Sequence, residues 1–161
     1  MILFEQLATT GSMLHGLLHI RCPRLKRGAM DACVSIIMPV YNCEQYLEQS
    51  FRSALSQSLN RLQVICIDDG STDRTSEILA SIAATDERVV IIRQTNQGAG
   101  KARNAGLQVA LGEIVSFHDS DDYYPDSTAL EMLYNAAKQN DVQVSAGFQV
   151  KLVGENHRTR R

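Results

Sequence analysis

Acidic side chains gather in the segment SFHDSDDYYP, residues 116–125, where a hydrophobic run ends in Asp119, Asp121 and Asp122. Two like charges about 4 Å apart repel by roughly 1 kcal/mol in water and by about 4 kcal/mol at the effective dielectric constant near a protein surface. Such a cluster therefore calls for a cation or a cationic partner. Asp119 and Asp121 form a D-x-D pair, whose hard oxygen ligands suit a divalent ion such as Mg²⁺ or Mn²⁺.

Other polar residues follow other hydrophobic runs, and each has a structural explanation of its own. Tyr41 fits an ordinary loop aromatic, and Asp68 and Asp69 fit caps of the next helix. Residues 96–100, NQGAG, fit a turn because Asn and Gly tolerate positive φ, and Arg103 fits a solvated helix residue. Taken alone, the three acidic residues are also typical of a turn followed by a helix cap. The joint placement of these residues after separate hydrophobic runs favours a functional site.

The elements that must position these residues alternate between strands and helices. Short β-branched segments, apolar nearly throughout, predict strands covered on both faces at residues 34–40, 62–67, 88–93, 113–117 and 142–148. Segments with one apolar stripe predict helices at residues 44–59, 75–84, 101–111 and 127–139. Asn42 with Gln45 predicts a capping box for the first helix, and Gly112 predicts the end of the third.

This alternation predicts right-handed βαβ crossovers and a mainly parallel sheet with helices on both faces. The predicted fold class is therefore α/β, a Rossmann-like sandwich. In open α/β sheets the ligand lies beyond the carboxyl ends of the strands. The loops that contain Tyr41, Asp69, Asn96 and Asp119 are thus expected to meet at one edge of the sheet.

Composition limits the classes of protein to consider. The 161-residue chain is 44% hydrophobic and 21% charged, which suits one globular domain. A net charge of −2 and a pI near 6.1 argue against a nucleic-acid-binding protein, which normally carries a concentrated basic face. The four cysteines lack C-x-x-C spacing and predict reduced thiols in a cytoplasmic protein. No apolar run reaches the ~18 residues of a membrane span, so we expect at most a peripheral association with the inner face of the membrane.

The N-terminal residues lack the alternating pattern. The predicted division of the chain is an N-terminal extension at residues 1–30, a globular domain at residues 31–150 and a basic tail at residues 151–161. Met30 is an alternative natural start, because DACVSIIMPVYN then enters the first strand almost at once. His15, His19 and Cys22 have the spacing of a zinc half-site, but no fourth ligand follows nearby.

Several known phosphate and metal motifs do not fit. TNQGAGKA lacks the first glycine of the P-loop, and Ala102 replaces its final Ser or Thr. Arg103 stands where the dinucleotide fingerprint needs a glycine after GAG. DSDDYY lacks the third ligand and the glycine of an EF-hand loop. His118 has no nucleophile elbow beside it and is predicted to be a local hydrogen-bonding residue.

Four motifs together resemble those of family 2 glycosyltransferases, which are nucleotide-sugar-dependent enzymes with a GT-A fold. The motifs are VSIIMPVYN, IDDGSTDRT, NQGAGKARNAG and GEIVSFHDSDD, in the order and spacing of that family, and the likeness covers about residues 34–147. The resemblance implies a donor-binding domain that transfers a sugar, with a UDP-sugar as the expected donor. The expected acceptor is a hydroxyl of a saccharide or lipid-linked molecule in polysaccharide or glycolipid synthesis. Most members of the family invert the anomeric configuration.

The resemblance also implies a nucleoside site on the first two loops. Pro39 and Tyr41 would line it, with Tyr41 against the base. Asp68 would hydrogen-bond to the base or the ribose, and Asp69 with the turn after it would support that wall.

The diphosphate and metal would lie beside the third and fourth loops. The resemblance implies that Lys101 and Arg103 lie beside the nucleotide, near its phosphates. Asp119 would face the ribose or the metal, and Asp121 would be the principal ligand of Mg²⁺ or Mn²⁺. The metal would stabilise the negative charge of the departing nucleoside diphosphate as a Lewis acid.

The general base of the reaction has no evident counterpart. In the resembled family it is a carboxylate in the acceptor-binding half that takes the proton of the acceptor hydroxyl. None of the remaining acids lies in a recognisable base motif; they are Asp126, Glu131, Asp141 and Glu155. The catalytic base is therefore unassigned, and we predict a donor-binding half that is incomplete at the C-terminus. The alternative is a non-catalytic nucleotide-sugar-binding fragment.

Overall fold

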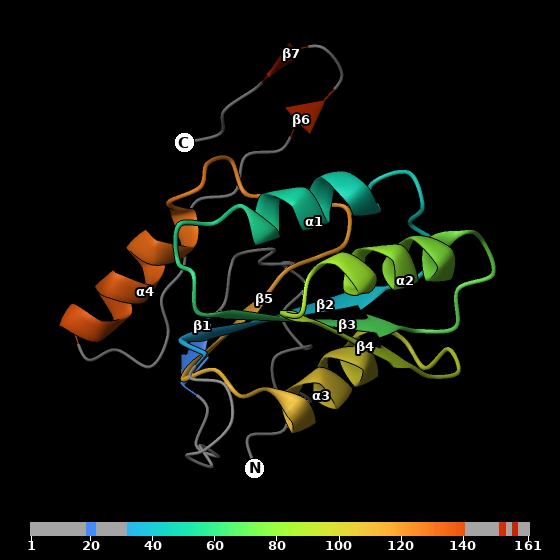
Figure 1. Cartoon of the computed structure of the whole chain (residues 1–161), viewed down its shortest axis with the longest axis horizontal. Helices are drawn as coiled ribbons and strands as arrows, with labels where there is room; N and C mark the ends of the chain where they lie inside the picture. The colour runs from blue at the N-terminus through green and yellow to red at the C-terminus, as the bar shows by residue number, and fades with distance from the viewer. Residues whose placement is uncertain (1–18, 22–31, 141–151, 154–155, 158–161) are drawn as a thin grey trace.

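The computed structural model describes residues 19–21, 32–140, 152–153 and 156–157 (Figure 1). The main sheet contains β1 (His19–Arg21), β2 (Val34–Val40), β3 (Leu62–Asp68), β4 (Val89–Arg93) and β5 (Ile114–Phe117). The helices are α1 (Leu47–Leu55), α2 (Thr75–Thr85), α3 (Ala99–Val109) and α4 (Ala129–Gln139). The short strands β6 (Leu152–Val153) and β7 (Asn156–His157) form a separate two-stranded sheet.

The strand order of the main sheet is β1-β5-β2-β3-β4. β5, β2, β3 and β4 are parallel, and helices connect them, as the alternating pattern predicted. β1 pairs with β5 in the antiparallel direction and was not predicted, because its three residues carry no recognisable alternation. The predicted strand at residues 142–148 lies outside the described residues.

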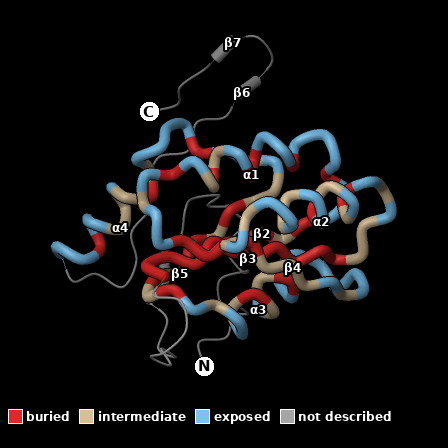
Figure 2. The backbone as a smooth tube through the Cα atoms, viewed as in Figure 1, coloured by how far each residue is buried: buried red, intermediate tan, exposed pale blue. Residues whose placement is uncertain are grey.

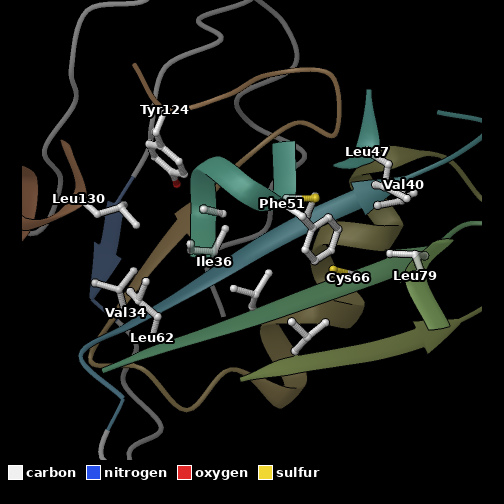
Figure 3. Close-up of a cluster of buried hydrophobic side chains, with 14 of the residues drawn as sticks. Val34, Ile36, Val40, Leu47, Phe51, Leu62, Cys66, Leu79, Tyr124 and Leu130 are labelled. Atoms are coloured by element: carbon white, nitrogen blue, oxygen red, sulfur yellow. The ribbon is translucent and has the colours of Figure 1, made fainter. Parts of the chain in front are cut away.

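The sheet is covered on both faces, which confirms the predicted sandwich. α1 and α2 lie over one face and α3 lies over the other (Figure 1). Phe51 of α1 and Leu79 of α2 pack on the first face, in a cluster that also takes in Leu130 of α4 (Figure 3). Ala102 of α3 packs on the second face against Ile65 of β3. Because β2 and β3 have helices on both sides, nearly all of their residues are buried (Figure 2).

The predicted capping box of the first helix is wrong. α1 begins at Leu47, and its N-cap residue is Tyr46, which makes no side-chain cap hydrogen bond. Asn42 has a φ of 46°, and its side-chain oxygen accepts a hydrogen bond from the Thr72 N–H at 2.8 Å. Asn42 therefore joins two loops and does not start a helix.

The predicted role of Gly112 as a helix end is also wrong, because α3 ends at Val109. A Cβ atom on Gly112 would lie only 2.3 Å from the backbone nitrogen of Ser35. The close approach lets the Gly112 N–H donate to the Ser35 hydroxyl at 2.8 Å, and that hydroxyl donates to Gln63 Oε1 at 2.7 Å. Glycine is required at this position because the loop before β5 packs directly on β2.

The cysteines that the structure describes are Cys33, Cys43 and Cys66, and all three are free and buried. Cys33 and Cys66, which the sequence placed in or beside apolar strands, are buried as expected. Burial raises the pKa of the thiols of Cys43 and Cys66. His15 and Cys22, two of the three residues with the spacing of a zinc half-site, lie outside the described residues. Among the residues that are described, no helix is long and apolar enough to cross a membrane.

Candidate functional site

The carboxyl ends of the central strands lie in one row of the sheet. Val40 pairs with Asp68, and Asp68 pairs with Arg93, so β2, β3 and β4 end side by side. β5 ends at Phe117, opposite Ile37 of β2, and its following loop emerges at the same edge. The four loops that were expected to converge therefore leave the sheet at one edge.

The loops after β2 and β3 are joined by hydrogen bonds. The side-chain oxygen of Asn42 accepts the Thr72 N–H at 2.8 Å, and the Cys43 N–H donates to the Thr75 hydroxyl at 3.0 Å. Tyr41 precedes this junction, and 49% of its surface is exposed. The ring of Tyr41 is therefore held on a fixed loop and is open to a planar ligand.

Asp68 is buried at the end of β3, and its carboxylate already has protein partners. It accepts hydrogen bonds from the Ser71 N–H at 2.9 Å and the Ser76 hydroxyl at 2.6 Å, and Arg93 Nε lies 3.2 Å away. Burial alone would raise the pKa of Asp68, but these partners outweigh burial and lower it. The nucleoside contact predicted for Asp68 stays a prediction.

Asp69 is also buried, and it holds the loop between β4 and α3. Its Oδ1 accepts hydrogen bonds from Gln94 Nε2 at 2.7 Å and the Gln97 N–H at 2.9 Å, and its Oδ2 accepts the Gly98 N–H at 2.7 Å. Gly98, with a φ of 87°, is the N-cap residue of α3. Asp69 thus fixes the start of the helix that carries Lys101. The sequence analysis did not identify Gln94 as a partner of Asp69. The order of residues in a loop does not show which neighbouring strand end the loop will contact.

The basic residues of α3 differ in their surroundings. Lys101 lies in the first turn and is exposed, whereas the side chain of Arg103 is 25% exposed and lies 2.5 Å from the Asp119 carboxylate. This ion pair joins α3 to the turn after β5. Arg103 is therefore one cationic partner of the acidic trio.

The acidic residues themselves form a tight turn after β5. The Asp122 N–H donates to the Asp119 carbonyl at 3.0 Å. Ser120 contacts the Cys43 thiol, and the negative charge of Asp121 also acts on that thiol, so the turn lies against the loop after β2. Asp121 is exposed, and no hydrogen bond or ion pair from the described part of the chain engages its carboxylate.

The carboxylates of this turn suit a metal ion that takes most of its ligands from water and substrate phosphates. Within the described ranges, no group of three or more His, Cys, Asp or Glu side chains is arranged to hold a metal ion. Mg²⁺ is usually bound by one or two carboxylates together with water and substrate phosphates. Asp121, exposed and unpaired, and Asp119 beside it are a donor set of that kind.

The remaining acids that the structure describes have structural partners. Asp126 accepts the Thr128 N–H at 2.8 Å near the start of α4, and Glu131 accepts the Ser58 hydroxyl at 2.5 Å. Asp141 and Glu155 lie outside the described residues. No general base is therefore assigned.

Comparisons with known proteins identify relatives of this chain. The model of Glycosyl transferase family 2 matches residues 35–161. An uncharacterized glycosyltransferase of Haemophilus influenzae is 45% identical over 115 residues, which cover 71% of this chain and 46% of that protein. Residues 1–349 of S. aureus TarS in complex with UDP align with a TM-score of 0.62 and 32% identity, covering 67% of this chain and 32% of that chain.

A mannosyltransferase of Pyrobaculum calidifontis, PcManGT, in complex with GDP-Man and Mn²⁺, aligns with a TM-score of 0.59 and 28% identity, covering 72% of this chain and 35% of that chain. The chain thus spans less than half the length of each of these three proteins. The family match at residues 35–161 includes the four parallel strands from Ser35 onward and the acidic turn. With the family match over most of its length and the same fold in solved relatives, the chain belongs to glycosyl transferase family 2 and has the Rossmann-like GT-A fold.

Proposed function

We propose that the chain binds a nucleoside diphosphate sugar, with UDP-sugar as the donor, through a divalent ion held by the turn after β5. The observation that carries this proposal is the exposed carboxylate of Asp121, which no hydrogen bond or ion pair within the described residues engages, at the same sheet edge as the exposed Tyr41. An aromatic face suits a base, and a carboxylate suits a hard cation. The two groups together match the two ends of a nucleoside diphosphate.

The nucleoside would lie against the loops after β2 and β3. Pro39 and Tyr41 would contact the base, and Asp68 and Asp69 would form the polar wall. The 49% exposure of Tyr41 supports this placement. Because Asp68 already has three protein partners, its contact with a nucleoside would have to share its carboxylate with them.

The diphosphate would lie at the start of α3. Lys101 is exposed in the first turn of that helix, where the positive end of the helix dipole also favours an anion. Arg103, two residues further along α3, would approach the diphosphate from the side of the acidic turn, toward which its pair with Asp119 directs it. Both residues therefore favour the negative charge that grows on the leaving group during transfer.

Asp121 and Asp119 would hold Mg²⁺ or Mn²⁺, which when bound would supply Lewis-acid stabilisation of the departing nucleoside diphosphate. The presence of Mn²⁺ with GDP-Man in PcManGT supports this assignment. The proposed reaction is sugar transfer, with inversion, to a hydroxyl of a saccharide or lipid-linked acceptor in polysaccharide or glycolipid synthesis. The poly(ribitol-phosphate) beta-glucosyltransferase of Bacillus spizizenii, 38% identical over 129 residues, supports a polymer acceptor.

A calorimetric titration of the chain with UDP, in the presence and absence of Mn²⁺, tests the proposal. We expect UDP to bind with an affinity that Mn²⁺ increases, and we expect Asp121→Ala to remove the increase without lowering thermal stability. Glu87→Ala is the matched control, because Glu87 is an exposed carboxylate before β4, at the opposite edge of the sheet. Absence of Mn²⁺-dependent UDP binding in the unmodified chain would refute the proposal.

A second candidate is a nucleotide-sugar-binding fragment without transfer activity. It is favoured by the structural partners of Asp126 and Glu131, which already engage both carboxylates. Measuring UDP release from UDP-sugars, with and without saccharide acceptors, separates the two candidates. Acceptor-dependent release supports the transferase, whereas UDP binding without any release supports the fragment.

A further inference from the structure

His118 is a buried residue at the start of the acidic turn that the proposed function does not use. It follows β5 directly, it is 4% exposed, and its N–H donates to the Ile37 carbonyl at 3.0 Å, which extends the sheet by one residue. Its ring lies between the turn and α1. The residue before Asp119 is therefore fixed by both its backbone and its side chain.

The ring of His118 bridges two elements by hydrogen bonds. Its Nε2 lies 3.0 Å from the Ser50 hydroxyl on α1. The backbone of Asp122 also hydrogen-bonds the ring and raises its pKa, as expected of a carbonyl that accepts from a ring N–H. One neutral tautomer satisfies both bonds: Nδ1–H donates to Asp122, and the Ser50 hydroxyl donates to Nε2.

The ring also stacks on the residue that ends the acidic segment. The rings of His118 and Tyr124 are nearly parallel, with an angle of 8° and a centroid distance of 4.6 Å. The Tyr124 N–H donates to the Ser53 hydroxyl on α1 at 3.0 Å. Both ends of the segment that contains Asp119 and Asp121 are therefore attached to the same helix.

We propose that His118 is a positioning residue, whose ring sets the Asp119 and Asp121 carboxylates for the divalent ion by bridging α1 and the turn. The inference rests on the proposed function, because the carboxylates have to be placed for a metal only if one binds there. Residues that orient metal ligands in this way commonly change metal affinity by about 10- to 100-fold when they are replaced. Leucine, which has a similar volume and no ring nitrogen, removes both hydrogen bonds at once.

The test compares His118→Leu and His118→Asn in the full chain, with UDP and Mn²⁺ as probes. For His118→Leu we expect UDP affinity in Mn²⁺ to fall by about 10- to 100-fold, while UDP affinity without Mn²⁺ stays the same. Asparagine places an amide N–H near the position of ring Nδ1 but has no atom at the position of Nε2, so His118→Asn keeps the bond to the turn, loses the bond to Ser50 and should recover only part of the affinity. Ser50→Ala, which breaks only the bond to α1, provides a further test if the leucine variant does not fold.

A second readout is independent of metal and nucleotide. Because the Asp122 N–H closes the turn, its hydrogen exchange in the metal-free chain should be faster in His118→Leu. Ser35→Ala is the matched control, since it removes a buried hydroxyl at the other end of β2 and should lower stability without changing either readout.

Two results overturn the inference. If the unmodified chain shows no Mn²⁺-dependent UDP binding, the proposed function is refuted and the inference falls with it. If the unmodified chain binds UDP in an Mn²⁺-dependent manner and His118→Leu or Ser50→Ala binds it equally, the inference is refuted and the proposed function stands.

Discussion

Replacing Asp69 by asparagine is expected to destabilise the fold, although the two side chains have nearly the same size. The carboxylate of Asp69 is buried and accepts hydrogen bonds from Gln94, Gln97 and Gly98. An asparagine has one acceptor oxygen and one donor group in the same space. Its NH₂ group must therefore face at least one of these N–H donors.

The expected loss follows from the geometry of the three bonds. If the asparagine oxygen takes the place of Oδ1, the bonds from Gln94 and Gln97 remain but lose the strength that the negative charge adds. The bond from the Gly98 N–H is lost, and because Gly98 is exposed, water can replace part of it. One lost charge-assisted bond and two weakened ones correspond to about 2–3 kcal/mol.

The loss should depend on pH with a definite sign. Burial alone would raise the pKa of Asp69, but its hydrogen bonds outweigh burial and hold the pKa below its ordinary value of 3.8. A carboxyl whose pKa is lower in the folded state stabilises the protein fully above its unfolded pKa, and this stability is lost as pH falls through the folded pKa. The difference between wild type and Asp69→Asn should therefore be largest near neutral pH and should shrink below about pH 4.

Urea unfolding of both proteins at pH 7 and at pH 3 measures this difference directly. At pH 7 the free energy of unfolding should fall by about 2–3 kcal/mol, or by roughly 5–10 °C in Tm for a chain of this size. The hydrogen exchange of the Gly98 N–H should also be faster in the variant. Equal stability at pH 7, or a difference that does not shrink in acid, would show that the three bonds do not hold the loop.

Three further substitutions test the packing that supports the site, and urea unfolding measures each. Gly100→Ala should stabilise the chain by about 0.5–1 kcal/mol, because its Cβ meets nothing within 4 Å and alanine favours the helix. Gly106→Ala, in the same helix, should cost about 1–3 kcal/mol, because its Cβ would lie 2.6 Å from Ile37. Ser35→Ala should cost about 1–3 kcal/mol, because it leaves the buried Gly112 N–H without its acceptor. A stabilising Gly106→Ala, or a neutral Ser35→Ala, would contradict the described packing.

The regular part of the fold could be predicted from the sequence because its physical causes are local. Strands that are covered on both faces must be apolar nearly throughout, and residues 34–40 and 62–67 meet that condition. A parallel sheet then requires crossover helices, and it fixes which ends of the strands meet. The common edge of Tyr41, Asp69 and Asp119 therefore followed from the alternation alone.

The parts that could not be predicted depend on contacts between distant segments. An asparagine such as Asn42 can cap a helix or can hydrogen-bond to another loop. Here the nearby Thr72 N–H makes it a loop contact. The glycine at 112 fits a helix end as well as a close approach to β2. Arg93, the ionic partner of Asp68, lies in β4, and the partners of Asp69 lie in the loop after β4, up to 29 residues away. Such choices are made by packing after the elements have formed.

The acidic residues at the site differ in how their negative charge is balanced. This difference indicates which of them would contribute most to binding a cation. Asp68 is balanced by Arg93 and Asp119 by Arg103, so neither requires an external cation. Among the described residues no hydrogen bond or ion pair engages the Asp121 carboxylate, and it is the carboxylate whose charge a divalent ion would relieve most. The acidic cluster thus has two kinds of cationic partner. Arg103 pairs with Asp119 in the absence of a ligand, and a bound metal ion would interact most favourably with the exposed Asp121.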